Sequence, residues 1–239
     1  MTTHTEQEIA KFDALAADFW NRDGEFKTLH QINPIRLKFI AELMPLSGKH
    51  VADIGCGGGI LAEALDERGA RVTAIDLSEV GIQTAKAHQQ QSGSQVDYRV
   101  QSTADFAAEL ASHSLLDGVF CMEMLEHVKN PESIIADCAR MLKPGGLAVF
   151  STINRTKKAH LLAVIVAEYI IRMVPQGTHD PKLFIKPSQM QRMAAKAGLQ
   201  AVDIIGFEYR PFSNDFVRSH NTDINYIFAF RKISTPQKQ

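Results

Sequence analysis

The stretch Val51-Ala-Asp-Ile-Gly-Cys-Gly-Gly-Gly-Ile60 determines how the rest of the chain is organised. The apolar run 51–54 is typical of a buried strand, the glycines that follow are typical of a sharp turn, and residues 60–65 open a helix. Glycine is needed where the backbone takes a positive φ, or where a ligand leaves no room for a Cβ. The stretch therefore predicts a strand, a ligand-binding turn and a helix.

A carboxylate follows the second predicted strand. The apolar run 71–75 ends on Asp76, seventeen residues after Gly59. An acid at the tip of this strand can accept two charge-assisted hydrogen bonds from a ribose diol. We therefore expect a nucleoside cofactor at the carboxyl edge of a parallel sheet.

The glycine spacing narrows the choice of nucleoside. Counted from Gly55, the dinucleotide pattern G-x-G-x-x-G requires a glycine where the chain has Ile60, which disfavours NAD and FAD. The looser form Gly57-x-Gly59-x-x-Ala62 keeps a dinucleotide open. A P-loop is excluded, because no Lys-Ser or Lys-Thr follows the glycines. The remaining common ligand of Asp-x-Gly-x-Gly with a downstream acid is S-adenosylmethionine (SAM), and a purely structural turn is the alternative.

Two further segments follow the glycine turn in a recognisable order. Residues 115–121 lead into Met122-Glu-Met-Leu-Glu-His127, and Met141-Leu-Lys-Pro-Gly-Gly146 precedes the apolar run 147–151. Over roughly residues 35–152 this order resembles class I SAM-dependent methyltransferases. The resemblance implies an α/β, Rossmann-like sheet of seven strands with helices on both faces, and SAM as the methyl donor. Apolar runs at 202–207 and 224–230 predict the last two strands.

Length and composition are those of an ordinary soluble domain. A chain of 239 residues, 45% hydrophobic and 22% charged, suits one α/β domain spanning residues 1–239. The net charge of -1 argues against a nucleic-acid partner. The Asn/Asp-Pro-Pro-aromatic signature of base-modifying methylases is also missing after Cys121. Three cysteines without metal-type spacing and a polar start at 1–8 favour a cytoplasmic protein.

The N-terminal region is expected to form a helical cover over residues 1–34. Apolar residues recur on one helical face within residues 6–21, which predicts a first helix. Asn33-Pro34 is expected to interrupt the chain, and a second helix is expected over 35–43 with Arg36 near its start.

A second extension is predicted at residues 154–187, after the fifth strand. Residues 160–174 are nearly all apolar but contain Glu168 and Arg172, and the run is too short to span a bilayer about 30 Å thick. Basic side chains flank it at Arg155, Lys157, Lys158, Lys182 and Lys186. A buried core helix is one interpretation. The other is a lid whose residues 155–175 contact anionic membrane lipids.

Further motifs narrow the resemblance over roughly residues 7–231. They are Phe26-Lys-Thr-Leu-His30, Ile32-Asn-Pro-Ile-Arg36, Asp53-Ile-Gly-Cys-Gly-Gly-Gly59, Cys121-Met-Glu-Met-Leu-Glu-His127, Met173-Val-Pro-Gln-Gly-Thr-His-Asp180 and Phe184-Ile-Lys-Pro187. They are similar to the ubiquinone biosynthesis O-methyltransferase family. The resemblance implies methylation of two phenolic intermediates, a 2-polyprenyl-6-hydroxyphenol and 3-demethylubiquinol. It also implies that Arg36, Gly55, Asp76 and Met122 bind SAM, to which the glycine motif adds Asp53 and Gly57.

Glu123, Glu126 and His127 are the candidate catalytic cluster. If the segment is helical, their spacing places all three on one side. They match a metal site proposed for related mitochondrial enzymes, so Mg²⁺ bound by the three is one hypothesis. A base formed by His127, with Glu126, is the second hypothesis. An acidic loop with a helix-capping histidine is the structural alternative.

The resemblance also implies where the protein works and what it meets. A polyprenyl tail lies in the bilayer, so we expect a peripheral protein at the inner face of the cell membrane, and contacts with other ubiquinone biosynthesis enzymes are open. Two alternatives remain. One is a SAM-dependent methyltransferase of another lipophilic molecule, such as a fatty acid or a menaquinone precursor. The other is a non-catalytic scaffold with a SAM-binding fold.

Overall fold

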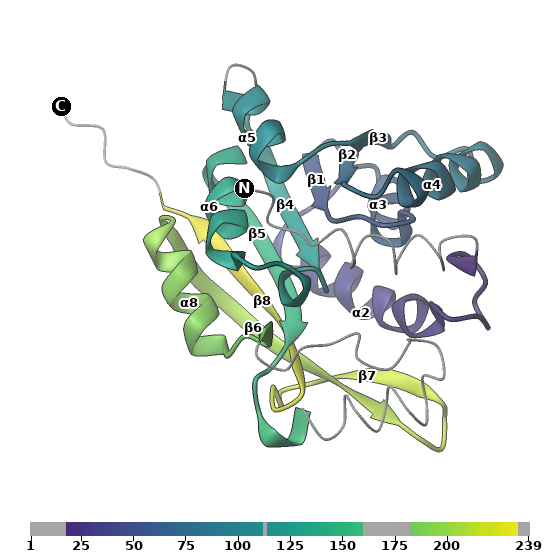
Figure 1. The fold of residues 1–239 in the computed structure, drawn as a ribbon, viewed down its shortest axis with the longest axis vertical. Helices are drawn as coiled ribbons and strands as arrows, with labels where there is room; N and C mark the ends of the chain where they lie inside the picture. The colour runs from purple at the N-terminus through teal and green to yellow at the C-terminus, as the bar shows by residue number, and fades with distance from the viewer. Residues whose placement is uncertain (1–17, 112–113, 160–182, 234–239) are drawn as a thin grey trace.

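The computed structural model describes residues 18–111, 114–159 and 183–233, and its centre is an eight-stranded sheet (Figure 1). The strands, in spatial order, are β3 (Asp97–Val100), β2 (Arg71–Asp76), β1 (His50–Ile54), β4 (Leu116–Met122), β5 (Leu142–Ile153), β8 (Asn225–Lys232), β6 (Leu199–Arg210) and β7 (Asp215–Ser219). The first five are parallel, and β8 runs antiparallel to β5 and β6. The predicted Rossmann-like α/β class is confirmed.

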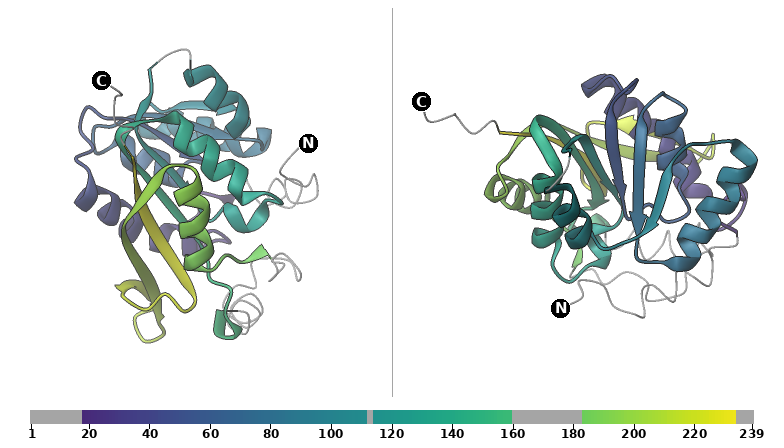
Figure 2. Two further views of the ribbon diagram at one scale, coloured as in Figure 1. Left: turned by 90° about the vertical axis from the view of Figure 1, so that its left-hand side faces the viewer. Right: turned by 90° about the horizontal axis from the view of Figure 1, so that it is seen from above.

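Helices cover both faces of the sheet (Figure 2). On one face lie α2 (Lys27–Leu43), α3 (Ile60–Asp66) and α4 (Glu79–Ser92), and on the other lie α5 (Thr103–Ala111), α6 (Pro131–Met141) and α8 (Pro187–Lys196). Alternate residues of a strand enter different cores: Ala52 and Ile54 face α5 and α6, whereas Val51 faces α2 and α3. The central strands are therefore apolar on both sides, as expected of a sheet between two helical layers.

Polar side chains cap the starts of two helices. The Ser78 side chain accepts a hydrogen bond from the Gly81 N–H at 2.7 Å and caps α4, which ends at Gly93 with φ +76°. The Asn130 side chain caps α6 by accepting from the Ser133 N–H at 3.2 Å. These side chains satisfy N–H groups that a helix leaves without a partner at its start.

The expected break at Asn33-Pro34 is wrong, because α2 is continuous from Lys27 to Leu43 with Pro34 inside it. Proline removes one helical donor and usually ends or kinks a helix. Here Ile32, Phe39 and Ile40 are fully buried on the sheet, and their packing outweighs the missing hydrogen bond. A single rigid helix therefore carries both Asn33 and Arg36.

The predicted count of seven strands is too small by one. Strand β7 pairs antiparallel with β6 and was missed because residues 215–219 are only half-buried or exposed and have no clear apolar alternation. The segment 143–146, which precedes the predicted strand 147–151, lies within β5 as an irregularity: Leu142 pairs with Leu116, and the regular register resumes at Leu147 opposite Gly118. Neither difference affects the carboxyl edge of the parallel strands.

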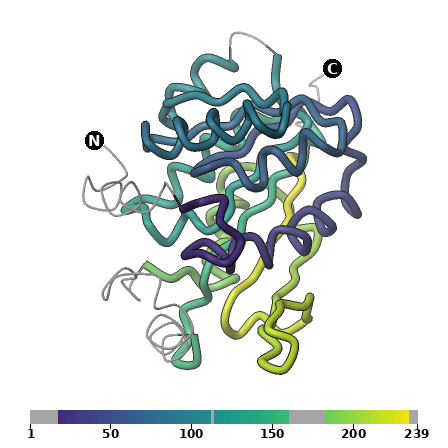
Figure 3. Tube along the Cα trace, turned by 90° about the vertical axis from the view of Figure 1, so that its right-hand side faces the viewer, coloured from purple at the N-terminus to yellow at the C-terminus, as the bar shows by residue number. Residues whose placement is uncertain are grey.

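Most of the two predicted extensions falls outside the described residues. This applies to residues 6–17 of the first predicted helix and to the apolar segment 160–174, so cover and lid stay predictions. Within the ranges that the model describes, no helix is long and apolar enough to cross a membrane. The described chain begins at Asp18, and its first residues run beside α4 (Figure 3).

Candidate active site

The glycine turn joins β1 to α3 and requires its glycines for two different reasons. Gly59 precedes α3 with φ +91°, and a Cβ there would lie 2.2 Å from the Tyr98 hydroxyl. Gly55 has φ +72°, and its Cβ would lie 2.7 Å from Cγ of Met124. Backbone conformation and close packing therefore both exclude a side chain. The Gly55 and Cys56 N–H groups donate to the Ile75 carbonyl, which fixes the turn against β2.

Asp76 connects the second strand to this turn. Its carboxylate accepts a hydrogen bond from the Gly57 N–H at 2.8 Å and another from the Ser78 N–H at 2.9 Å. The side chain is half-buried at the carboxyl edge of the sheet. Each carboxylate oxygen has two lone pairs, so these bonds leave acceptor capacity for a ribose diol. The carboxylate is thus already oriented by the backbone that a nucleoside would lie against.

Asp53 is buried beneath the turn. It accepts a backbone hydrogen bond from Ala62 in α3, and burial raises the pKa of its carboxyl to about 7, with the Arg36 charge opposing the rise. A nearby carboxylate, Asp76, raises it further. Asp53 therefore ties α3 to β1, and this geometry supports the turn whether or not the side chain contacts a ligand.

Arg36 extends from α2 toward the end of β4 and is 4% exposed. Its Nη2 lies 3.2 Å from Oε1 of Glu123, and neither Nε nor Nη2 has a hydrogen-bond partner. The Ser151 hydroxyl donates to the same Glu123 oxygen at 2.6 Å. Buried guanidinium donors without acceptors are costly, and a planar fork suits a second carboxylate. Arg36 is thus paired in charge with Glu123 through Nη2, and its buried Nε–H, which has no acceptor, suits a second anionic group beside that carboxylate.

The segment after β4 is not the regular helix that the cluster hypothesis assumed. Glu123 has φ +50°, and only Leu125–His127 form a short 3₁₀ turn. Glu126 is buried, and the Thr152 hydroxyl donates to its Oε2 at 2.7 Å. Burial, and then the neighbouring charge of Glu123, raises the pKa of Glu126 well above its usual value. The two carboxyl groups therefore lie close together, but by a backbone reversal and not by helical spacing.

His127 is half-buried beside Glu126, and its backbone N–H donates to the Met124 carbonyl at 3.0 Å. Met122, the last residue of β4, is 8% exposed and packs in the core that faces α2 and α3. Among the described residues, no group of three or more His, Cys, Asp and Glu side chains is arranged to hold a metal ion. The metal hypothesis for Glu123, Glu126 and His127 stays a prediction.

Comparison with known proteins decides the family. A methyltransferase domain model matches residues 52–150. The ubiquinone biosynthesis O-methyltransferase of Thiobacillus denitrificans is 50% identical over 225 residues, which cover 94% of this chain and 96% of the relative. That of Pseudomonas putida is 51% identical over 227 residues, covering 95% and 97%. This chain belongs to the ubiquinone biosynthesis O-methyltransferase family. The chain is a SAM-dependent O-methyltransferase.

More distant solved structures share the fold of this O-methyltransferase family member. Magnesium protoporphyrin IX methyltransferase from Synechocystis, solved with bound SAH, aligns with a TM-score of 0.68 at 19% identity, over 95% of this chain and 100% of the other. A possible histamine N-methyltransferase from Thermotoga maritima aligns with a TM-score of 0.65 at 14% identity, over 93% and 99%. At these identities the likeness concerns the fold alone.

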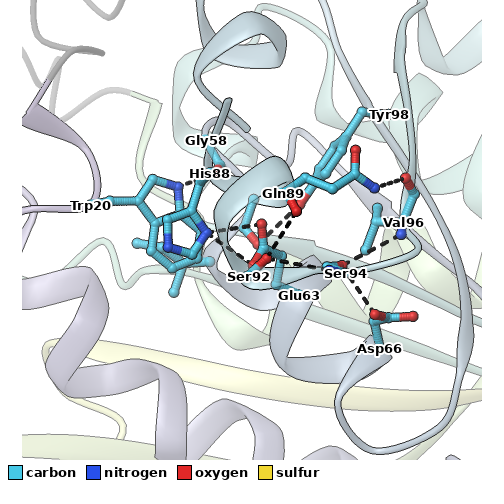
Figure 4. Close-up of polar contacts among 12 residues, drawn as sticks. Trp20, Gly58, Glu63, Asp66, His88, Gln89, Ser92, Ser94, Val96 and Tyr98 are labelled. Carbon is cyan, nitrogen blue, oxygen red and sulfur yellow. Dashed lines mark hydrogen bonds and ion pairs between the residues drawn. The ribbon is translucent and has the colours of Figure 1, made fainter. Parts of the chain in front are cut away.

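Sequence reasoning about the O-methyltransferase site missed the groups that hold its charged side chains. Ser151 and Thr152 end β5 and contact Glu123 and Glu126. Polar residues at the carboxyl end of an apolar parallel strand are the signal that could have found them. Trp20 was assigned to a helix face, but its indole N–H donates to the Gly58 carbonyl at 2.9 Å (Figure 4). No local pattern predicts this contact, because the two residues are 38 positions apart.

Proposed function

We propose that the chain transfers the methyl group of SAM to phenolic oxygens of polyprenylated ubiquinone precursors, a 2-polyprenyl-6-hydroxyphenol and 3-demethylubiquinol. The observation that carries the proposal is the buried Arg36, whose Nη2 is in an ion pair with Glu123 and whose Nε has no hydrogen-bond partner. The printed names of relatives about 50% identical over nearly the whole chain support the acceptor class.

The residues at the carboxyl edge fit SAM. Arg36 would bind the methionine carboxylate through its buried Nε–H, which has no acceptor, while Nη2 keeps its ion pair with Glu123, and Asp76 would accept from the ribose hydroxyls. Gly55 and Gly57 would let the backbone approach the ligand, with Asp53 holding the turn from below. Met122 would pack against the adenosine. SAM would supply an electrophilic methyl group on a sulfonium, and these residues would hold it at the end of β4.

The protein's main catalytic task is alignment. Methyl transfer is an in-line displacement, so the acceptor oxygen, the methyl carbon and the sulfur must lie on one line. A phenol has a pKa near about 10, and the nucleophilic phenolate is scarce at neutral pH. His127, beside the buried Glu126, is the candidate base that removes the phenol proton.

The contacts of Glu123 and Glu126 favour His127 as a base over a metal ion at these residues. Glu123 is engaged by Arg36 and Ser151, and Glu126 by Thr152. Mg²⁺ binding would have to replace these contacts and recruit further oxygen ligands. We therefore derive no step from a metal, and we keep Glu123, Glu126 and His127 as the residues to test for one.

A polyprenyl tail requires access to a bilayer. Residues 155–175 combine a basic start with an apolar run, and we propose that they contact anionic lipids at the inner face of the cell membrane. Of these, residues 155–159 are described. Arg155 and Lys157 are exposed, and Lys158 lies 3.5 Å from Asp223 in an exposed ion pair.

Methyl transfer from labelled SAM to a short-tailed 3-demethylubiquinol tests the function, with Arg36→Gln as the binding variant. We expect transfer by the native chain and a large rise in the KM for SAM in the variant. Transfer that EDTA abolishes and Mg²⁺ restores would favour a metal at Glu123, Glu126 and His127, whereas transfer indifferent to EDTA would favour His127 as base. SAM binding without transfer to any phenol would overturn the proposed acceptor.

A further inference from the structure

Two consecutive aromatic residues lie on the outer side of the glycine turn. Phe19 is buried, and its ring occupies the space where a Cβ on Gly58 would lie, 2.3 Å from the nearest ring carbon. Trp20 donates its indole N–H to the carbonyl oxygen of the same glycine at 2.9 Å. Gly58 does not have a positive φ. It is therefore the approach of Phe19, and not the backbone conformation, that requires a glycine at this position.

Trp20 is also held from its other side. Its indole stacks face to face on the imidazole of His88 in α4, with ring centroids 3.4 Å apart and 3° between the planes (Figure 4). Nδ1 of His88 lies 3.0 and 2.9 Å from the two carboxylate oxygens of Glu63 in α3. The Glu63 side chain is 4% exposed, so its carboxylate depends on this partner. The stack thus connects the start of the described chain to both helices that flank the turn.

Residues 18–26, which we call the strap, are held together by contacts among themselves. The Asp18 carboxylate accepts from the Glu25 N–H at 3.0 Å, and the Asn21 N–H donates to the Asp18 carbonyl at 3.0 Å. The Phe19 and Phe26 rings lie 4.4 Å apart. The strap is therefore a folded unit. Phe19 and Trp20 both contact the glycine turn at Gly58, and Trp20 also stacks on His88.

We propose that Trp20 is a positioning residue that seats the strap on the glycine turn, and that the seated strap retains SAM in its site. The inference rests on the proposed function, because it assumes that SAM lies against the same turn. Gly57 and Gly58 are adjacent: Gly57 is held by Asp76 on the ribose side, and Gly58 by the strap. SAM and the strap bind the same conformation of the glycine turn, so each stabilises the binding of the other. Bound SAM therefore favours the seated strap, and the seated strap slows SAM release.

The chain provides its own probe, since Trp20 is its single tryptophan. Intrinsic fluorescence of the full native chain therefore reports on the strap alone. Titration with SAM or SAH is expected to change the Trp20 emission, with a midpoint equal to the Kd from calorimetry. Emission that stays constant while calorimetry shows SAM binding would overturn the coupling.

Variants measure how much the strap contributes. Trp20→Ala and His88→Ala are each expected to raise the SAM Kd about five- to tenfold, the effect of losing one modest contact. In the double variant, the fold-increase in the SAM Kd is expected to be smaller than the product of the two single-variant increases, because both side chains act through one stack. The KM for SAM should rise while kcat stays within about twofold. The control Phe212→Ala removes a fully exposed aromatic ring from the β6–β7 hairpin. It should change neither the Kd nor the KM for SAM.

The outcomes separate this inference from the proposed function. SAM Kd values equal to the native value in Trp20→Ala and His88→Ala overturn the role of the strap and leave the methyltransferase standing. Altered Kd values with no methyl transfer to any phenol by the native chain overturn the acceptor and keep the strap. A fall in thermal stability without a change in the SAM Kd would show that Trp20 is merely structural, which also overturns the inference.

Discussion

At the scale of single residues, Asp76 combines two roles that a substitution can separate. Its carboxylate holds the Gly57 and Ser78 N–H groups and faces the proposed ribose site. We expect Asp76→Ala to weaken SAM binding by about 1.5–3 kcal/mol for each lost charged hydrogen bond. Calorimetric titration with SAM measures this loss. The control is Ser78→Ala, which removes the α4 cap and should lower thermal stability alone; an unchanged Kd in Asp76→Ala would remove that residue from the site.

Asp53 predicts a pH dependence of stability. Burial raises the pKa of its carboxyl from the ordinary 3.8 to about 7. Between these values the unfolded chain releases a proton that the folded chain retains, so the contribution of Asp53 is full below about pH 4 and is lost as the pH rises through 7. Asp53→Asn keeps an oxygen for the Ala62 N–H but cannot ionise.

We therefore expect Asp53→Asn to stabilise the protein, relative to the native chain, more at pH 8 than at pH 5. The difference is on the order of 1.4 kcal/mol for each pH unit between pH 5 and the folded pKa of about 7, because the loss below pH 5 is common to both measurements. Urea unfolding at the two pH values measures it. Equal differences at both pH values would show that Arg36 fully compensates the Asp53 charge.

At the scale of elements, the glycine turn illustrates how backbone and packing constraints combine. Gly59→Ala places a Cβ at φ +91° and 2.2 Å from the Tyr98 hydroxyl, and we expect a loss of about 2–4 kcal/mol of folding stability. Gly93→Ala is a matched control, because Gly93 has φ +76° with nothing within 4 Å, and it should lose only about 1 kcal/mol. Thermal or urea unfolding compares the two. If Tyr98→Phe does not reduce the cost of Gly59→Ala, the hydroxyl oxygen is not the cause, because the added Cβ would also lie 2.8 and 3.0 Å from the ring carbons Cζ and Cε1.

The elements that sequence predicted well are those with local signals. The strand-turn-helix unit at 51–65 is set by nearby residues, and the structure has it as predicted. The passage of α2 through Pro34 and the pairing of β7 with β6 depend on packing against distant parts of the chain. The stack of Trp20 on His88 joins residues 68 positions apart, and no periodicity carries that information.

In the candidate site, too, the sequence could locate only the residues that have a local signal. Asp76 and the glycines could be located because a strand end and a turn have recognisable sequences. The environment of Glu123 could not, since it depends on a positive φ and on Arg36 and Ser151 from two other elements. A spacing argument that assumes a helix fails where the backbone reverses.

At the scale of the whole molecule, the overall charge gives little attraction to an anionic membrane. The net charge is -1, so binding must come from a local surface and from apolar contact. Three exposed basic side chains directly precede the apolar segment 160–174, whose structure lies outside the described residues; they belong to Arg155, Lys157 and Lys158. If this surface binds lipid headgroups, its contribution must depend on both lipid charge and ionic strength.

Lys157→Glu tests this electrostatic contribution. Each cationic side chain near an anionic surface contributes about 1 kcal/mol, and the substitution reverses one charge, so we expect vesicle binding to weaken about fivefold or more at low salt. Co-sedimentation with anionic and with neutral phospholipid vesicles measures it. Lys86→Glu, an equally exposed change on α4, is the control for net charge and should bind as the native chain does. Equal losses of vesicle binding in both variants would indicate a general effect of net charge. Vesicle binding that does not depend on salt and is unchanged in both variants would leave the apolar segment as the sole anchor.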